Sequence, residues 1–115
     1  AYTVILANGE FPTNPIPLSI LNNCNYLVCC DGAVNNLAQT IKEPDAIVGD
    51  CDSVSEENKA KYKDIIHRIS EQETNDLTKA VNFCAKLGRK KITILGATGK
   101  REYQPMSAYY VNISI

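Results

Sequence analysis

The chain has 115 residues, of which 44% are hydrophobic and 22% charged, and a formal net charge of −1. This is the composition of an ordinary globular domain that is long enough to bury a core of its own. The near-neutral charge gives no electrostatic basis for binding nucleic acid or an anionic membrane, and no apolar run approaches the about 20 residues that a membrane span needs.

The five cysteines favour neither a disulfide framework nor a zinc site. Their number is odd, Cys29 and Cys30 are adjacent within an apolar run, and no Cys-x-x-Cys pair occurs. Unpaired thiols are typical of reducing compartments. We therefore expect a cytoplasmic protein.

Strand-like and helix-like segments alternate along the first hundred residues. Strands are predicted at residues 2–7, 26–30, 46–48, 65–69 and 91–95. Helices are predicted between them at residues 18–22, 33–40, 55–63 and 76–87. Continuous apolar strands in such an alternation predict a doubly wound α/β domain, with a mostly parallel sheet and helices on both faces in a Rossmann-like, three-layer arrangement. We assign this domain to residues 1–102 and treat residues 103–115 as a tail, in which 108–115 is strand-like.

Two of the predicted helices carry specific local signals. In the segment 33–40, apolar residues recur at i, i+3, i+4 and i+7, namely Val34, Leu37, Ala38 and Ile41. For the segment 55–63, Ser55 is a plausible N-cap, with acidic residues in the first turn.

Polar loops follow the predicted strands, and in an open α/β sheet ligands bind beyond the carboxyl ends of the strands. The sharpest of these loops is residues 49–53, Gly-Asp-Cys-Asp-Ser, directly after the strand 46–48. Asp50 and Asp52, at i and i+2, can both reach one Mg²⁺, which usually takes one or two carboxylates together with substrate phosphates. An Asx-type turn with solvated carboxylates is the structural alternative for this loop.

A third acid, Asp76, stands at the start of the helix predicted over residues 76–87. Taken alone, Asp76 is explained by the helix dipole, and Asn75 by an N-cap role. Together with Gln72 in the same loop, these residues favour a ligand site, because helix N-termini also offer free N–H groups to phosphate. We predict that Asp50, Asp52 and Asp76 bind one divalent cation, with a polyphosphate as its companion.

Two further loops carry polar groups. Asp31, with Asn35 one turn later, could bind a nucleotide or metal, or merely cap a helix. The segment 96–101 contains two glycines, Thr98 and two cations, a composition suited to phosphate contacts. It is not a P-loop, because Ile94 stands where the first glycine of that motif is required.

Over residues 30–101, the order of these motifs resembles the catalytic domain of the thiamine pyrophosphokinases. The matching segments are residues 30–35, 44–53, 72–80 and 96–101. The resemblance implies transfer of diphosphate from ATP, as co-substrate, to thiamine, giving thiamine diphosphate and AMP with Mg²⁺ as cofactor. It assigns catalysis and metal binding to Asp50, Asp52 and Asp76. It assigns nucleotide or thiamine contacts to Asp31, Asn35, Gln72, Asn75, Thr98 and Arg101.

The sequence departs from the family pattern after Glu102. Residues 103–107 read Tyr-Gln-Pro-Met-Ser, where the family pattern continues with an Asp-His pair and a helix. The resemblance implies a second domain, a β-sandwich that completes the thiamine site and a homodimer, and this domain is largely missing from the 115 residues. We interpret the segment 108–115 either as a strand of that domain or as the close of a truncated chain.

Two other functions stay open from the sequence. Asp50 and Asp52 resemble the Asp-x-Asp loop of haloacid-dehalogenase-like phosphatases, although Gly49 intervenes after the apolar run and the other motifs fit poorly. A non-catalytic nucleotide- or thiamine-binding module is the second alternative, and such a module would bind Mg-ATP without forming AMP.

Overall fold

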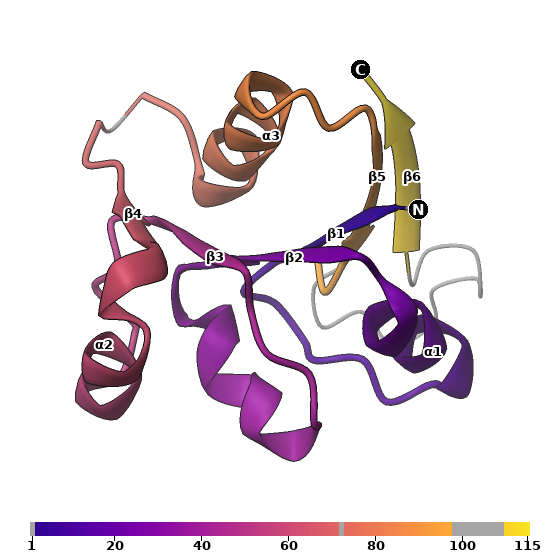
Figure 1. The fold of residues 1–115 in the computed structure, drawn as a ribbon, viewed down its shortest axis with the longest axis horizontal. Coiled ribbons are helices and arrows are strands. Elements are labelled where there is room, and N and C mark those ends of the chain that lie inside the picture. The colour runs from indigo at the N-terminus through magenta and orange to yellow at the C-terminus, as the bar shows by residue number, and fades with distance from the viewer. Residues whose placement is uncertain (1, 72, 98–109) are drawn as a thin grey trace.

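A mixed sheet of six strands forms the centre of the molecule, in the order β4-β3-β2-β1-β5-β6 (Figure 1). The computed structural model describes residues 2–71, 73–97 and 110–115. The first five strands are mutually parallel and β6 is antiparallel to β5. The strands are β1 (Thr3–Leu6), β2 (Tyr26–Cys30), β3 (Ala46–Gly49), β4 (Ile66–Arg68), β5 (Lys91–Leu95) and β6 (Tyr110–Ser114).

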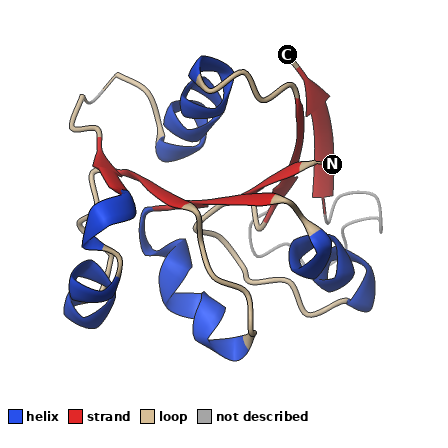
Figure 2. Ribbon diagram, viewed as in Figure 1, coloured by secondary structure: helices blue, strands red, loops and turns tan. Residues whose placement is uncertain are grey.

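Helices cover both faces of this sheet, as Figure 2 shows. The helical segments are α1 (Pro15–Asn23), the 3₁₀ helix η1 (Asp31–Gln39), α2 (Glu56–Lys61), the 3₁₀ turn η2 (Lys63–Ile65) and α3 (Asp76–Lys86). On one face, Leu21 of α1 and Leu37 of η1 pack on the sheet in one buried cluster. On the other face, Ala80 and Cys84 of α3 pack on it in a second cluster. The prediction of a mostly parallel sheet between two helical layers is confirmed in this form.

The helix predicted over residues 33–40 is wrong in type. Residues 31–39 form a 3₁₀ helix, in which side chains repeat every three residues. Asp31, Val34 and Leu37 are accordingly buried at a spacing of three. The predicted α-helical stripe would also bury Ile41, which is instead 99% exposed. The chain from Asp31 to Leu37 is therefore a narrow, tightly wound segment that packs on one face of the sheet.

Local capping signals predicted the starts of α2 and α3 well, whereas α1 begins at Pro15, three residues before the helix predicted at residues 18–22. The Ser55 hydroxyl accepts a hydrogen bond from the Asn58 N–H at 3.2 Å, so Ser55 is the N-cap of α2 as expected. The Asn75 side chain likewise accepts from the Thr78 N–H at 2.8 Å and caps α3. Among the described residues, no helix combines the length and the apolar character needed to cross a lipid bilayer.

The strand predicted near the C-terminal end forms and joins this same sheet. In β6, Ile113 pairs with Ile92 and Val111 with Ile94 of β5. The Thr93 hydroxyl donates a hydrogen bond to the Asn112 side-chain oxygen at 2.7 Å, which fixes the register of the pair. A domain boundary at residue 102 stays a prediction, since residues 98–109 lie outside the described part of the chain.

Candidate functional site

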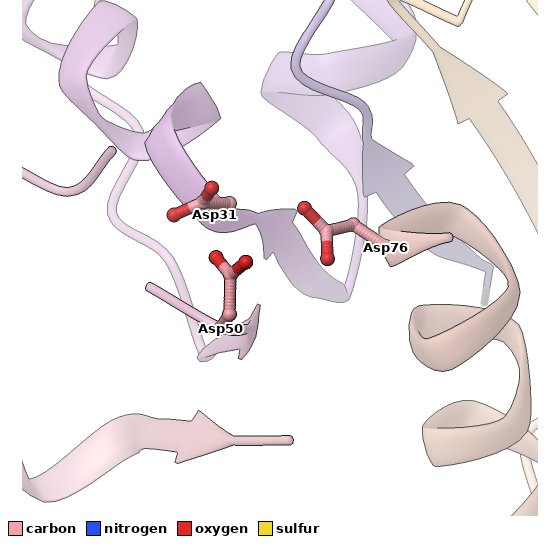
Figure 3. A group of neighbouring side chains, drawn as sticks. All are labelled: Asp31, Asp50 and Asp76. Atoms are coloured by element: carbon pink, nitrogen blue, oxygen red, sulfur yellow. The ribbon is translucent and has the colours of Figure 1, made fainter. Parts of the chain in front are cut away.

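Three carboxylates converge at the carboxyl edge of the sheet (Figure 3). Asp31 follows β2, Asp50 follows β3, and Asp76 begins α3. Each offers one oxygen, and these oxygens all lie within 4.8 Å of one another. We call Asp31, Asp50 and Asp76 the acidic cluster. Because parallel strands end at one edge, residues 45 positions apart in the chain can meet there.

Two glycines make this convergence possible. Gly49 has a φ of +139°, and a Cβ at this position would lie 3.1 Å from Oδ1 of Asp76. At Gly32, a Cβ would lie 2.8 Å from the Cβ of Ser53. Side chains at either position would therefore push the acidic loops apart.

Two non-glycine residues of the site adopt left-handed backbone conformations. The φ angles are +47° at Asp31 and +66° at Cys51. Such conformations are uncommon outside glycine and persist where the surroundings hold them in place. Here the Asp31 carboxylate accepts a hydrogen bond from the Ser53 N–H at 3.1 Å, and the buried Cys51 thiol donates to the Gly49 carbonyl at 3.6 Å. The loop after β3 is thus wrapped around Asp31.

Burial and mutual repulsion govern the electrostatics of the acidic cluster. Asp31 is only 5% exposed, and this burial raises the pKa of its carboxyl, which the Asp50 and Asp76 carboxylates raise further. Burial also raises the pKa of Asp76, and the Asp50 carboxylate raises it further. The nearby Lys79 ammonium acts in the opposite direction and lowers the pKa of Asp76. A divalent cation placed between the three carboxylates would remove this repulsion.

The acidic cluster fits a hard divalent cation. All three donors are carboxylate oxygens, the ligand type that Mg²⁺ and Ca²⁺ prefer. Two oxygens bound directly to one Mg²⁺ at about 2.1 Å can be no more than about 4.2 Å apart. Oxygens that lie within 4.8 Å of one another suit a Mg²⁺ held by one or two of them directly and by the rest through water. The remaining coordination positions would then be open to phosphate oxygens.

Asp50 and Asp76 meet as the sequence predicted, and Asp31 joins them although we had assigned it to nucleotide contacts. Asp52 is not among the three gathered carboxylates: it is exposed, and its N–H donates to Oδ1 of Asp50 at 3.1 Å. This is the Asx-type turn that the sequence left open as the structural alternative. A metal role for Asp52 stays a prediction.

Two of the predicted binding amides, Asn35 and Asn75, are occupied by the protein itself. The Asn35 side chain donates to the Ser53 carbonyl at 2.8 Å and accepts from the Ser55 N–H at 3.1 Å and the Asn58 amide at 2.9 Å. It therefore braces the loop after β3, a role that the sequence did not reveal. Asn75 serves as the α3 cap. The predicted contacts of Gln72, Thr98 and Arg101 lie outside the described residues.

One charged residue of the site escaped the sequence-based assignment. Lys79 is only 6% exposed, and its ammonium lies 3.9 Å from Oδ1 of Asp76. The i, i+3 spacing from Asp76 within the predicted helix was the signal that could have revealed it. A lysine is almost never this buried unless it is paired.

The family model described as "Thiamin pyrophosphokinase, catalytic domain" matches residues 18–114. Thiamin pyrophosphokinase 1 of Caenorhabditis elegans is 32% identical over 81% of this chain and 39% of its own length. Thiamine pyrophosphokinase 1 of Oryza sativa subsp. japonica is 30% identical over 88% of this chain and 47% of its own length. The solved structure of thiamin pyrophosphokinase from Candida albicans superposes with a TM-score of 0.60 at 34% identity, covering 75% of this chain and 32% of that one. The chain therefore spans less than half the length of these relatives.

Proposed function

The chain belongs to the thiamin pyrophosphokinase family, and from this premise we propose that it transfers diphosphate from ATP to thiamine, giving thiamine diphosphate and AMP. The observation that carries the proposal is the acidic cluster, where Asp31, Asp50 and Asp76 bring three carboxylate oxygens within 4.8 Å of one another at the carboxyl edge of the sheet. Three converging carboxylates with raised pKa values at Asp31 and Asp76 suit a cation-bound polyphosphate.

The residues of the acidic cluster would hold Mg²⁺, which when bound supplies charge neutralisation and orientation of the phosphates. The chemical step is attack of the thiamine hydroxyl oxygen on the β-phosphorus. The bond between that phosphorus and the oxygen that bridges it to the α-phosphorus breaks, AMP leaves with that oxygen, and the hydroxyl proton is released to water. Such transfers depend mainly on positioning and electrostatic stabilisation.

The chain's own part in this step is to keep the carboxylates fixed. Arg68 donates a hydrogen bond to the Asp50 carbonyl at 2.8 Å, which ties the end of β4 to the loop after β3. Asn35 and the Asp31 carboxylate hold the same loop from the side of β2. The N-terminus of α3, where Asp76 lies, directs the positive end of the helix dipole at the cluster.

The proposal also includes the fold type, second domain, oligomeric state, location and cofactor that the family resemblance implies. We infer a doubly wound, Rossmann-like catalytic domain that acts with a β-sandwich domain and pairs through it as a homodimer in the cytoplasm. Magnesium as the cofactor, and the absence of a nucleic-acid partner, are also inferred. The lengths of the relatives support a larger protein, since this chain spans 39% and 47% of them.

Phosphorus NMR of the protein with ATP, Mg²⁺ and thiamine tests the proposal. We expect AMP and thiamine diphosphate to appear only when thiamine is present. Inorganic phosphate formed without thiamine would point to a phosphatase using Asp50 and Asp52 instead. Binding of Mg-ATP without any AMP would leave a nucleotide-binding module.

A further inference from the structure

Among the described residues, β6 forms one edge of the central sheet and pairs with β5 on one side only (Figure 1). An unpaired strand edge invites pairing with another chain, and proteins commonly protect such edges with short strands, charges or proline. The opposite edge strand, β4, follows this rule, because it has three residues and its His67 and Arg68 are exposed. The five residues of β6 contain neither a charge nor a proline. Of the two edges in the described chain, that of β6 is therefore the one open to pairing.

The backbone of β6 directs a defined set of hydrogen-bonding groups outward. The Ile115 N–H donates to the carbonyl of the residue before β5 at 3.0 Å, so the backbone groups of Ile115 face β5. In an antiparallel pair, the residues of one strand alternately face the partner strand and face away from it. The backbone groups of Val111 and Ile113 therefore also face β5, whereas those of Asn112 and Ser114 face the open edge.

Exposed apolar side chains accompany these outward backbone groups. Val111 is 45% exposed and Ile115 is 53% exposed. Both lie on the same face of β6 as Ile113, because side chains of a strand alternate with a period of two. Ile113 itself packs against the second buried cluster, on the α3 side of the sheet. A strand that paired with β6 would thus also cover Val111 and Ile115.

A second copy of β6 matches all of these groups in an antiparallel register centred on Ile113. In that register, Asn112 of each copy lies opposite Ser114 of the other, and their outward N–H and C=O groups can exchange hydrogen bonds. Val111 of each copy lies opposite Ile115 of the other, so each exposed apolar side chain contacts an apolar partner. No like charges meet, because residues 110–115 carry no charged side chain.

We propose that two copies of this chain pair through β6 in this register and form one continuous sheet across a twofold axis. Two identical antiparallel strands are related by such an axis, so the contact is self-complementary and closes at two copies. A strand pair of five residues is small beside a stable interface, which buries about 1,200–2,000 Å², and the dimer should therefore be weak. This contact is separate from the acidic cluster and from a homodimer formed through a second domain.

Hydrogen exchange of the full chain, followed by NMR at micromolar and at millimolar concentration, tests the pairing without any substitution. At the higher concentration, we expect slower exchange of the Asn112 and Ser114 amides, which would become hydrogen-bonded between copies. The Val111 and Ile113 amides already face β5, so their exchange should change much less.

Sedimentation equilibrium over the same concentrations tests the register. Val111→Lys and Ile115→Glu should each weaken the dimer by about tenfold, because each variant loses two apolar cross-strand pairs per dimer. Both substitutions in one chain should restore dimerisation, since the register sets each introduced lysine opposite an introduced glutamate. Both side chains are exposed, so urea unfolding of the dilute monomer should stay close to that of the wild type.

Ile41→Lys is the matched control, because Ile41 is a 99% exposed apolar side chain between η1 and β3, and its replacement should leave the dimer unchanged. The inference is overturned if the wild type stays monomeric at millimolar concentration, or if exchange at Asn112 and Ser114 is independent of concentration. It is also overturned if Ile41→Lys weakens the dimer as much as Val111→Lys does. A double variant that dimerises no better than the single variants overturns it too, since β6 would then pair in another register.

Discussion

The carboxylate of Asp76 lies directly against the backbone of Gly49, so that a Cβ on Gly49 would be 3.1 Å from Oδ1 and 3.2 Å from Cγ of Asp76. The contact joins the end of β3 to the start of α3. It brings the acids on these two elements together, because Asp50 is the next residue after Gly49.

Gly49→Ala should therefore disturb both stability and cation binding. The φ of +139° is strained for alanine, at a cost of about 1–3 kcal/mol, and the new methyl group would displace the Asp76 carboxylate. Chemical unfolding and Mg²⁺ titration measure the two effects. Gly88→Ala is the control: its φ is +80° but nothing lies within 4 Å of the added Cβ. It should lose stability and keep Mg²⁺ affinity; equal Mg²⁺ affinity in both variants would remove the steric argument.

Asp31→Asn should stabilise the cation-free protein at neutral pH. The pKa of Asp31 is raised in the fold, so its favourable contribution is present below the ordinary carboxyl pKa of about 3.9 and is lost as pH rises through the raised value. Asparagine has no charge to lose and can still accept from the Ser53 N–H. Urea unfolding in EDTA should show an advantage over wild type at pH 7 that disappears in acid.

Added Mg²⁺ should reverse that order, because the wild type gains binding energy that Asp31→Asn cannot gain fully. Asp64→Asn, which replaces an exposed aspartate on η2, serves as a control in which added Mg²⁺ should not change the order of stability. If the wild type is more stable than Asp31→Asn in EDTA at pH 7, then the ionised Asp31 carboxylate does not destabilise the cation-free protein, and the prediction is wrong.

Asp50→Asn and Asp52→Asn should differ strongly, although both remove one carboxylate from the same loop. Asp50 belongs to the acidic cluster, and Asp52 lies in the Asx-type turn. We expect Asp50→Asn to reduce thiamine-dependent AMP formation by ~10²-fold or more, the scale of losing one strong transition-state interaction. Asp52→Asn should lose much less; an equal loss would restore Asp52 as a metal ligand.

Asn35→Ala tests whether that amide braces the loop or binds substrate. Loss of its three hydrogen bonds should lower the free energy of unfolding by about 1–3 kcal/mol and weaken Mg²⁺ binding through the loosened loop. Asn35→Asp keeps the acceptor for Ser55 and should lose less stability. A direct substrate role predicts the opposite result, with normal stability and Mg²⁺ affinity but a higher KM for ATP or thiamine.

Much of this fold was predictable because its signals are local. The apolar run of β5 and the caps Ser55 and Asn75 are each determined within a few residues of sequence, and all three predictions are confirmed. The 3₁₀ helix η1 was not predictable from periodicity, since Val34 and Leu37 fit a spacing of three as well as an α-helical stripe. The exposed position of Ile41 decides between them only in the folded chain.

The sequence predicts where the candidate site lies, but not which residues belong to it. Sequence position puts Asp31, Asp50 and Asp76 after strands, and the parallel sheet then gathers them. Whether Asp50 or Asp52 points inward depends on the left-handed turn at Cys51, a conformation that no composition rule predicts. The brace at Asn35 likewise depends on a contact between separate elements, whereas the Lys79 charge pairs with Asp76 within α3, at an i, i+3 spacing that the sequence does show.

Asp76 faces two partners at once: it shares the acidic cluster with Asp31 and Asp50, and its Oδ1 lies 3.9 Å from the ammonium of Lys79 in the same helix. A cation bound at the cluster would compete with that ammonium for the one carboxylate. Occupation of the cluster would therefore be felt inside α3, as a weaker attraction between Asp76 and Lys79.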